Sequence, residues 1–186
     1  MRLFFALWPD SRARARMEAL GVALPMAASA PLADQARRVS PSNYHLTVAF
    51  LGEVAETSVD ALRTWAAAQH FPGFALTFDA YEYWPKPEVV VAAARQIPTE
   101  LELLWQAMHI EIAAHGLGLN PKRLRPHVTL TRKVTQAPVL PTMSPFEWQP
   151  QSFSLVRSDR GGSSSVYTVV DTWPLLYAEL NHSESA

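Results

Sequence analysis

One short pattern constrains this chain more than any other, the segment NYHLTVAFLG at residues 43–52. It alternates as a half-buried β-strand does, and its apolar face carries Leu46, Val48 and Phe50. His45 and Thr47 stand two residues apart, so their side chains point together to the opposite face. A single copy of this pattern does not indicate a function.

The same pattern occurs a second time. Residues 45–48 read His-Leu-Thr-Val and residues 127–130 read His-Val-Thr-Leu, so both segments follow the order histidine, apolar, threonine, apolar. At this composition, which includes six histidines, two full copies arise by chance about 0.2% of the time. The duplication therefore indicates a function rather than a coincidence.

The spacing of the motif suggests phosphate chemistry. On one face of a strand, residues two apart lie roughly 6.5–7 Å apart along the chain. Two such strands facing each other would surround a phosphate group with two imidazoles and two hydroxyls, and hydroxyls can donate to phosphate oxygens. Because the ordinary pKa of histidine lies near neutrality, one imidazole can act as a base while the other acts as an acid.

The histidines also allow interpretations without phosphate chemistry. His70, His109, His115 and His182 stand outside any such pattern, and we expect them to be structural. A zinc site would need a third ligand at recognisable spacing from His45 and His127, and the sequence offers none. The chain also has no cysteine, which excludes thiolate metal sites, disulfides and cysteine nucleophiles. We expect neither a metal nor another cofactor.

Composition limits the remaining possibilities. With 186 residues, 48% of them hydrophobic and 18% charged, the chain suits one soluble globular domain. The net charge of −1 gives no overall basic field, so a nucleic-acid role must rest on a local patch or a small ligand. The apolar run at the amino terminus is too short for a signal peptide, and no segment approaches the roughly 20 apolar residues of a membrane span. We expect a cytoplasmic protein with no membrane partner.

The periodicity predicts an α+β fold with mostly antiparallel sheet. Strands are expected at 3–8, 43–52, 74–84, 88–95 and 127–134, followed by a hairpin of 153–160 and 165–175. Helices are expected at 11–24, 57–69 and 98–118. Their predicted N-caps are Asp10, then Thr57 or Ser58, then Thr99. A proline-rich stretch at 138–150 separates the strand 127–134 from the hairpin, and the last residues, 181–186, are expected to be a frayed tail.

In these motifs the sequence resembles the 2H phosphoesterase superfamily, and within it the bacterial RNA 2′,3′-cyclic phosphodiesterases, also called 2′-5′ RNA ligases. The segments that carry the resemblance are RLFFALWP, HLTVAFLG, RPHVTLTR and the closing pair SLVRSDR and YTVVDTWPL. The resemblance implies one bilobal domain over residues 1–180. Its two sheets would line a central cleft, with helices outside and a pseudo-twofold relating the lobes. A monomer is expected, because one chain would assemble the whole cleft.

The resemblance also implies roles. His45 would protonate the leaving 3′ oxygen of a 2′,3′-cyclic phosphate, and His127 would activate the attacking water, leaving a 2′-phosphate. Thr47 and Thr129 would hold phosphate oxygens, as would Arg132. Strict alternation turns Arg132 away from His127, so it reaches the cleft only if the strand bulges or ends there.

Three alternatives stay open on the sequence. The same histidines could run the reverse step and join RNA ends. The substrate could instead be a small cyclic nucleotide or a 2′-5′ linkage, and a non-catalytic RNA or nucleotide binder could use the same cleft. Trp84, Tyr83 and Phe5 are candidates, by residue type alone, for stacking on a base.

Overall fold

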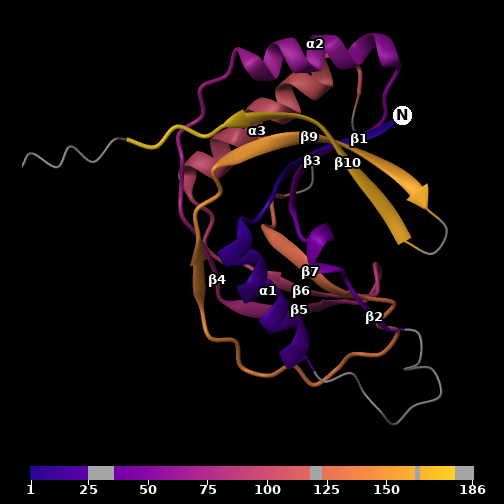
Figure 1. The fold of residues 1–186 in the computed structure, drawn as a ribbon, viewed down its shortest axis with the longest axis vertical. Helices are drawn as coiled ribbons and strands as arrows, with labels where there is room; N and C mark the ends of the chain where they lie inside the picture. Colours follow the sequence, from indigo (N-terminus) through magenta and orange to yellow (C-terminus); the bar gives the residue numbers. More distant parts are fainter. Residues whose placement is uncertain (25–35, 118–122, 162–163, 179–186) are drawn as a thin grey trace, which may run out of the picture.

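The computed structural model describes residues 1–24, 36–117, 123–161 and 164–178. The predicted tail at 181–186 lies outside these ranges. The described chain contains three α-helices, a short 3₁₀ helix and three antiparallel sheets, which confirms the α+β class (Figure 1).

Two sheets have four strands each, and the third has two. The first sheet has the order β10 (Ser164–Pro174), β9 (Ser152–Gly161), β1 (Arg2–Leu7), β3 (Leu46–Glu53). The second has the order β2 (Arg37–Arg38), β7 (His127–Arg132), β6 (Val89–Ala93), β5 (Ala80–Trp84). The third pairs β4 (Leu76–Phe78) with β8 (Phe146–Trp148). The helices are α1 (Ser11–Ala23), α2 (Glu56–Ala67) and α3 (Thr99–Ala114), and the 3₁₀ helix η2 is Pro41–Asn43.

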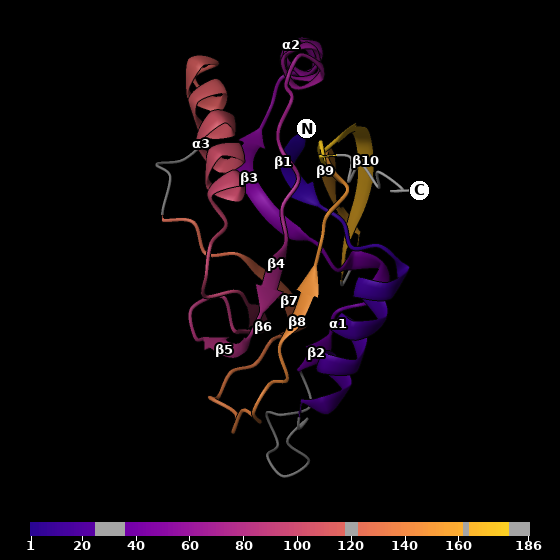
Figure 2. The ribbon, with the colours of Figure 1, turned by 90° about the vertical axis from the view of Figure 1, so that its left-hand side faces the viewer.

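The two larger sheets repeat one unit. In the first, β1 leads through α1 to β3, which pairs antiparallel with β1; in the second, β6 leads through α3 to β7, which pairs antiparallel with β6. The helices cross over, since α1 packs against β7 and α3 packs against β3. Figure 2 shows α3 running beside β3, with α1 on the opposite side of the molecule near β2 and β8. One hydrophobic core joins Leu3 and Phe5 of the first sheet to Val90 and Leu130 of the second.

The helix starts follow the predictions only in part. Asp10 caps α1 as expected, and its carboxylate accepts a hydrogen bond of 2.8 Å from the backbone N–H of Ala13. The other two predicted caps were wrong, because α2 begins after Ala55 and α3 after Pro98, and neither residue makes a side-chain capping bond. Acidic residues in the first turns, Glu56 in α2 and Glu100 and Glu102 in α3, face the positive end of the helix dipole instead.

The strand predicted at 74–84 is divided in two. β4 pairs with β8, whereas β5 pairs with β6, and Asp79 stands at the break. The ring of Phe78 stacks on Phe146 with centroids 5.2 Å apart, and on Trp148 at 6.2 Å. Burial of these rings explains why the proline-rich stretch 138–150 contains a strand that local periodicity missed. A partner so distant in sequence cannot be read from local alternation.

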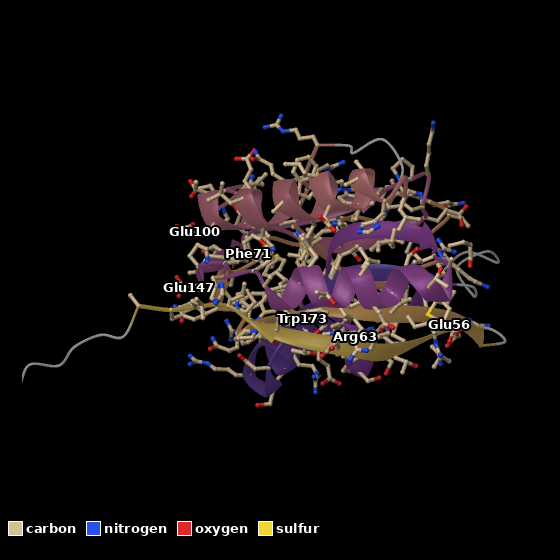
Figure 3. The ribbon with its side chains drawn as sticks, turned by 90° about the horizontal axis from the view of Figure 1, so that it is seen from above. Glu56, Arg63, Phe71, Glu100, Glu147 and Trp173 are labelled. Atoms are coloured by element: carbon tan, nitrogen blue, oxygen red, sulfur yellow. The ribbon has the colours of Figure 1, made fainter. Side chains whose placement is uncertain are left out.

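α2 packs against the first sheet, where it contacts β10 and places the Trp65 ring 6.1 Å from Phe5 of β1. Figure 3 looks onto this end of the molecule, where α2 lies alongside the yellow β10 with Arg63 and Trp173 labelled. Arg63 of α2 donates to Asp171 of β10 at 3.0 Å, and beneath them Trp173 stacks on Phe153 with centroids 5.4 Å apart. None of the helices over the described residues is long and apolar enough to cross a membrane.

Candidate active site

A cleft of about 390 Å³ opens between the two larger sheets, and all five predicted site residues line it. They are His45 and Thr47 near or on β3, and His127, Thr129 and Arg132 on β7. The expectation that both motif strands face one cleft is therefore met by the geometry. The functional role of each side chain remains a proposal, taken up below.

A β-bulge brings Arg132 to the cleft. On β7, Thr129 pairs with Val91 and Thr131 pairs with Val90, so Leu130 is an extra residue between them. Leu130 and Thr131 are consequently both buried, and the next side chain, Arg132, turns to the face of the motif. The bulge carries a cost, since the Thr131 hydroxyl is buried without a hydrogen-bond partner among the described residues.

An equivalent bulge occurs on β3. Phe5 of β1 pairs with Ala49 and Ala6 pairs with Thr47, which leaves Val48 as the extra residue. Val48 and Ala49 are both buried, and Phe50 is 56% exposed and lines the cleft. The expectation that Phe50 shares the buried face of Leu46 and Val48 was wrong for this reason. Phe50 stands five residues after the motif histidine, as Arg132 does on β7.

Both motif histidines are held in one tautomer. Nδ1 of His45 lies 2.7 Å from the carbonyl oxygen of Asn43, and Nδ1 of His127 lies 2.7 Å from that of Arg125. A carbonyl can only accept, so each Nδ1 carries the hydrogen and donates it. The other ring nitrogen, Nε2, is left to accept a proton when the ring is neutral and to donate one when it is charged.

The surroundings lower the pKa of both histidines. Burial lowers the pKa of His45 to about 4, with smaller lowering contributions from the positive charges of Arg132 and His127, against the bond to Asn43. Burial also lowers the pKa of His127, and Arg125 and Arg132 add to that effect, while the bond to the Arg125 carbonyl and the carboxylate of Glu82 oppose it.

The two imidazoles have different neighbours. His45 lies among three aromatic rings, with centroid distances of 5.2 Å to Phe4, 5.3 Å to Trp8 and 4.9 Å to Tyr167. His127 instead packs on the single ring of Trp84 at 4.4 Å.

Trp84 also contacts a pair of charged residues. Its indole N–H donates to Glu82 at 2.7 Å, and Glu82 also accepts a bond of 2.6 Å from Arg125. The Arg125 guanidinium lies 4.3 Å from the centre of the Trp84 ring. These contacts with Glu82 and Arg125 hold the indole in place against His127.

The charges of the cleft favour an anion. Arg2 and Arg132 are the charged residues among those described that line it, and no described carboxylate does. Thr47 and Thr129 are half-buried, and their hydroxyls can donate to an oxyanion. Two arginines, two hydroxyls and two imidazole Nε2 atoms suit a phosphate group that undergoes proton transfer.

Sequence reasoning missed seven residues that line the cleft: Arg2, Phe4, Phe50, Pro87, Val89, Ser158 and Tyr167. Of the three candidate stacking aromatics, only Trp84 lines it. Phe5 is fully buried, and Tyr83 donates its hydroxyl to the Val134 carbonyl at 3.0 Å. The signal that could have found Phe50 is the parallel with Arg132, since both stand at the fifth position after a motif histidine.

The remaining described histidines lie elsewhere. Nδ1 of His109 bonds the Trp105 carbonyl within α3 at 2.8 Å, and His115 pairs with Glu111 at 2.9 Å. His70 is exposed. His182 lies outside the described ranges. In the part of the chain that the structure describes, no group of three or more histidine, cysteine, aspartate or glutamate side chains is arranged to hold a metal ion.

Two related strands each present a histidine and a threonine to one cleft that two arginines also line. This fold and this site are those of a two-histidine phosphoesterase. Comparison with known proteins agrees. The model of the LigT-like phosphoesterase family matches residues 18–92. The RNA 2′,3′-cyclic phosphodiesterase of Escherichia coli is 33% identical over 144 residues, which cover 76% of this chain and 81% of that protein. The enzyme of that name from Thermus thermophilus is 31% identical, covering 94% and 90%.

Solved structures give the same result. The crystal structure of E. coli LigT complexed with 3′-AMP has a TM-score of 0.82 at 30% identity, covering 94% of this chain and 97% of that one. A structure from Thermus thermophilus has a TM-score of 0.79 at 26% identity, covering 94% of this chain and 98% of that one. This chain belongs to the family of LigT-like phosphoesterases.

Proposed function

We propose that this protein hydrolyses 2′,3′-cyclic phosphodiester ends of RNA to 2′-phosphomonoesters. The observation that carries the proposal is the pair of imidazoles, each with Nδ1–H bonded to a backbone carbonyl, that line one cleft with two threonines and Arg132. The names of the relatives, RNA 2′,3′-cyclic phosphodiesterases, support the choice of substrate.

The proposed reaction divides the proton transfers between the two lobes. Nε2 of His127 takes a proton from water, and the water oxygen attacks phosphorus. The bond from phosphorus to the 3′ oxygen breaks, and Nε2–H of His45 gives its proton to that oxygen. Exchange of one proton with solvent then restores both rings.

The phosphate would be held by neutral and charged donors together. The hydroxyls of Thr47 and Thr129 would donate to the non-bridging oxygens, and the Arg132 guanidinium would stabilise the charge that grows on them during attack. No step requires a metal, because two imidazoles supply both the base and the acid.

The lowered pKa values have a consequence for this assignment. At neutral pH both rings of the free protein are mainly neutral, since both pKa values lie below the ordinary value of 6.5. A bound phosphodiester brings a negative charge to the two imidazoles and favours protonation of one of them. We therefore expect kcat/KM, which reports the free enzyme, to be highest below pH 6.5.

The same groups could also join RNA ends. A 5′ hydroxyl in the place of water would lose its proton to His127 and attack phosphorus. The bond from phosphorus to the 3′ oxygen would break, and His45 would protonate that oxygen, which leaves a 2′-5′ linkage. Hydrolysis of small cyclic nucleotides or of 2′-5′ linkages would use the same residues. A non-catalytic binder would need no matched acid and base.

We further propose that residues 1–180 work as one bilobal domain and as a monomer in the cytoplasm. The cleft needs both sheets, and a single chain supplies them.

One assay tests the proposed function. An oligoribonucleotide ending in a 2′,3′-cyclic phosphate is incubated with the protein, with and without EDTA, and the 2′- and 3′-phosphate products are resolved. We expect only the 2′-phosphate and no effect of EDTA. Binding without turnover would favour the non-catalytic alternative, and activity lost with EDTA and restored by zinc would contradict metal independence.

A further inference from the structure

A second cavity, of about 240 Å³, adjoins the cleft. The indole of Trp84 lines both cavities, and so forms the wall between them. The rest of the second cavity is lined by Glu82 of β5, by residues 93–95 and Ile97 at and after the end of β6, and by residues 123–126, which lead directly into His127. Anything bound there lies next to the proposed reaction centre.

This cavity is basic although the chain as a whole is not. Arg95, Arg123 and Arg125 line it, and Glu82 is its single carboxylate among the described lining residues. The excess is positive on a chain whose net charge is −1. It supplies the local patch that a nucleic-acid role requires when no overall basic field is present.

Two of the three guanidinium groups are fixed in place. Nε of Arg95 donates to the Asp79 carboxylate at 3.0 Å, and Arg125 donates to Glu82 at 2.6 Å. A guanidinium has five N–H donors, so each keeps donors for a ligand after these bonds are made. The Arg123 side chain is exposed and makes no ion pair with any described residue.

The walls also include apolar surface. Ile97 and Leu124 line the cavity beside the edge of Trp84. A ligand with a phosphate group and a flat, partly apolar nucleoside matches this mixture, since aromatic and apolar walls accept any base while arginines hold the backbone. A free inorganic anion would leave the apolar walls unused.

We propose that this second cavity binds the nucleotide that precedes the cyclic-phosphate end of the same RNA strand, with Arg95, Arg123 and Arg125 holding its backbone phosphate. This inference rests on the proposed function and adds a preference for an RNA strand over a mononucleotide. Because the two cavities share Trp84, a strand can pass from one to the other without leaving the surface.

The test compares kcat/KM for a 2′,3′-cyclic mononucleotide with kcat/KM for an oligonucleotide ending in that nucleotide. Loss of one charged contact to phosphate by the substitution Arg123→Gln should lower the ratio of oligonucleotide to mononucleotide about tenfold, mainly through KM of the oligonucleotide. The salt dependence of oligonucleotide binding should also become shallower by about one in its logarithmic slope. Arg123→Lys should restore part of the ratio.

The matched control is Arg16→Gln, which removes the same charge from an exposed position on α1. Its ratio should equal that of the unaltered protein. An unchanged ratio in Arg123→Gln, with both substrates still hydrolysed, would overturn the second subsite and leave the proposed function intact. Failure of the unaltered protein to hydrolyse either substrate would instead overturn the proposed function.

Discussion

The strands β3 and β7 carry the same motif, each followed by a β-bulge, yet they present different chemistry to the cleft. Each holds its histidine by a 2.7 Å bond from Nδ1 to the carbonyl two residues earlier. Each then contains one extra residue that turns the fifth position after the histidine inward, and that position is Phe50 on β3 and Arg132 on β7. The fifth position therefore carries an apolar ring on β3 and a positive charge on β7.

The difference shows how a repeated unit can serve an asymmetric reaction. A cyclic phosphodiester has an anionic group on one side and a nucleoside on the other. The backbone supplies two equivalent imidazoles, and the fifth position adds an apolar ring on β3 and a guanidinium on β7.

The largest expected effect comes from removing a motif histidine, the residue that both strands share. Substitution of His45 or His127 by alanine removes one general acid or base and should lower kcat by about 10²–10⁴-fold. The double variant should lose less than the product of the two single losses, because the residues act as a unit. His109→Ala, on α3, serves as the control. Full activity in either single variant would contradict the mechanism.

The next effect comes from Arg132, the charged residue at the fifth position on β7. Arg132→Ala should lower kcat by about 10²-fold, because it removes a donor to the charge that grows on phosphate in the transition state. Arg132→Lys should recover part of the loss, since the charge returns without the planar fork. A loss confined to KM would show that Arg132 binds the substrate without stabilising the transition state.

A smaller effect is expected from Phe50, the apolar residue at the fifth position on β3. Phe50→Ala removes a surface that can stack on a base, and stacking contributes about 1–3 kcal/mol per base. KM should rise by about tenfold with kcat little changed, and Phe50→Leu should lie between. Equal losses of kcat in the Phe50 and Arg132 variants would remove the distinction between the two strands.

The last expected effect concerns stability and not turnover. The folded state holds the pKa of His45 at about 4 against 6.5 when unfolded, so protonation favours the unfolded chain. The stability contribution is complete above pH 6.5 and is lost as pH falls toward 4. Between pH 7 and pH 5 this one residue should cost about 2 kcal/mol of unfolding free energy.

Urea unfolding at the two pH values measures this cost. His45→Gln should lose about 2 kcal/mol less stability than the unaltered protein over the same interval. The exposed substitution His70→Gln is the matched control. The same acid sensitivity in His45→Gln as in the unaltered protein would show that burial of this ring does not disfavour its charge.

Much of the fold and the centre of the site could be predicted from the sequence, because both rest on local patterns. Alternation located the strands, and the duplicated histidine and threonine located the cleft. The bulges could not be predicted, since an extra residue is defined only against the partner strand. For the same reason Phe50 was assigned to the wrong face, and β8 was missed because Phe78, its partner in the core, lies far away in sequence.

The assignment of acid to His45 and base to His127 is the central claim, and a substrate with sulfur in place of the bridging 3′ oxygen tests it most directly. A thiolate leaves without needing a proton, so an acid is no longer required. The account predicts that this substrate restores hydrolysis in His45→Ala and leaves His127→Ala inactive. Restoration in His127→Ala but not in His45→Ala would reverse the roles, and restoration in neither would contradict the assignment of an acid to His45.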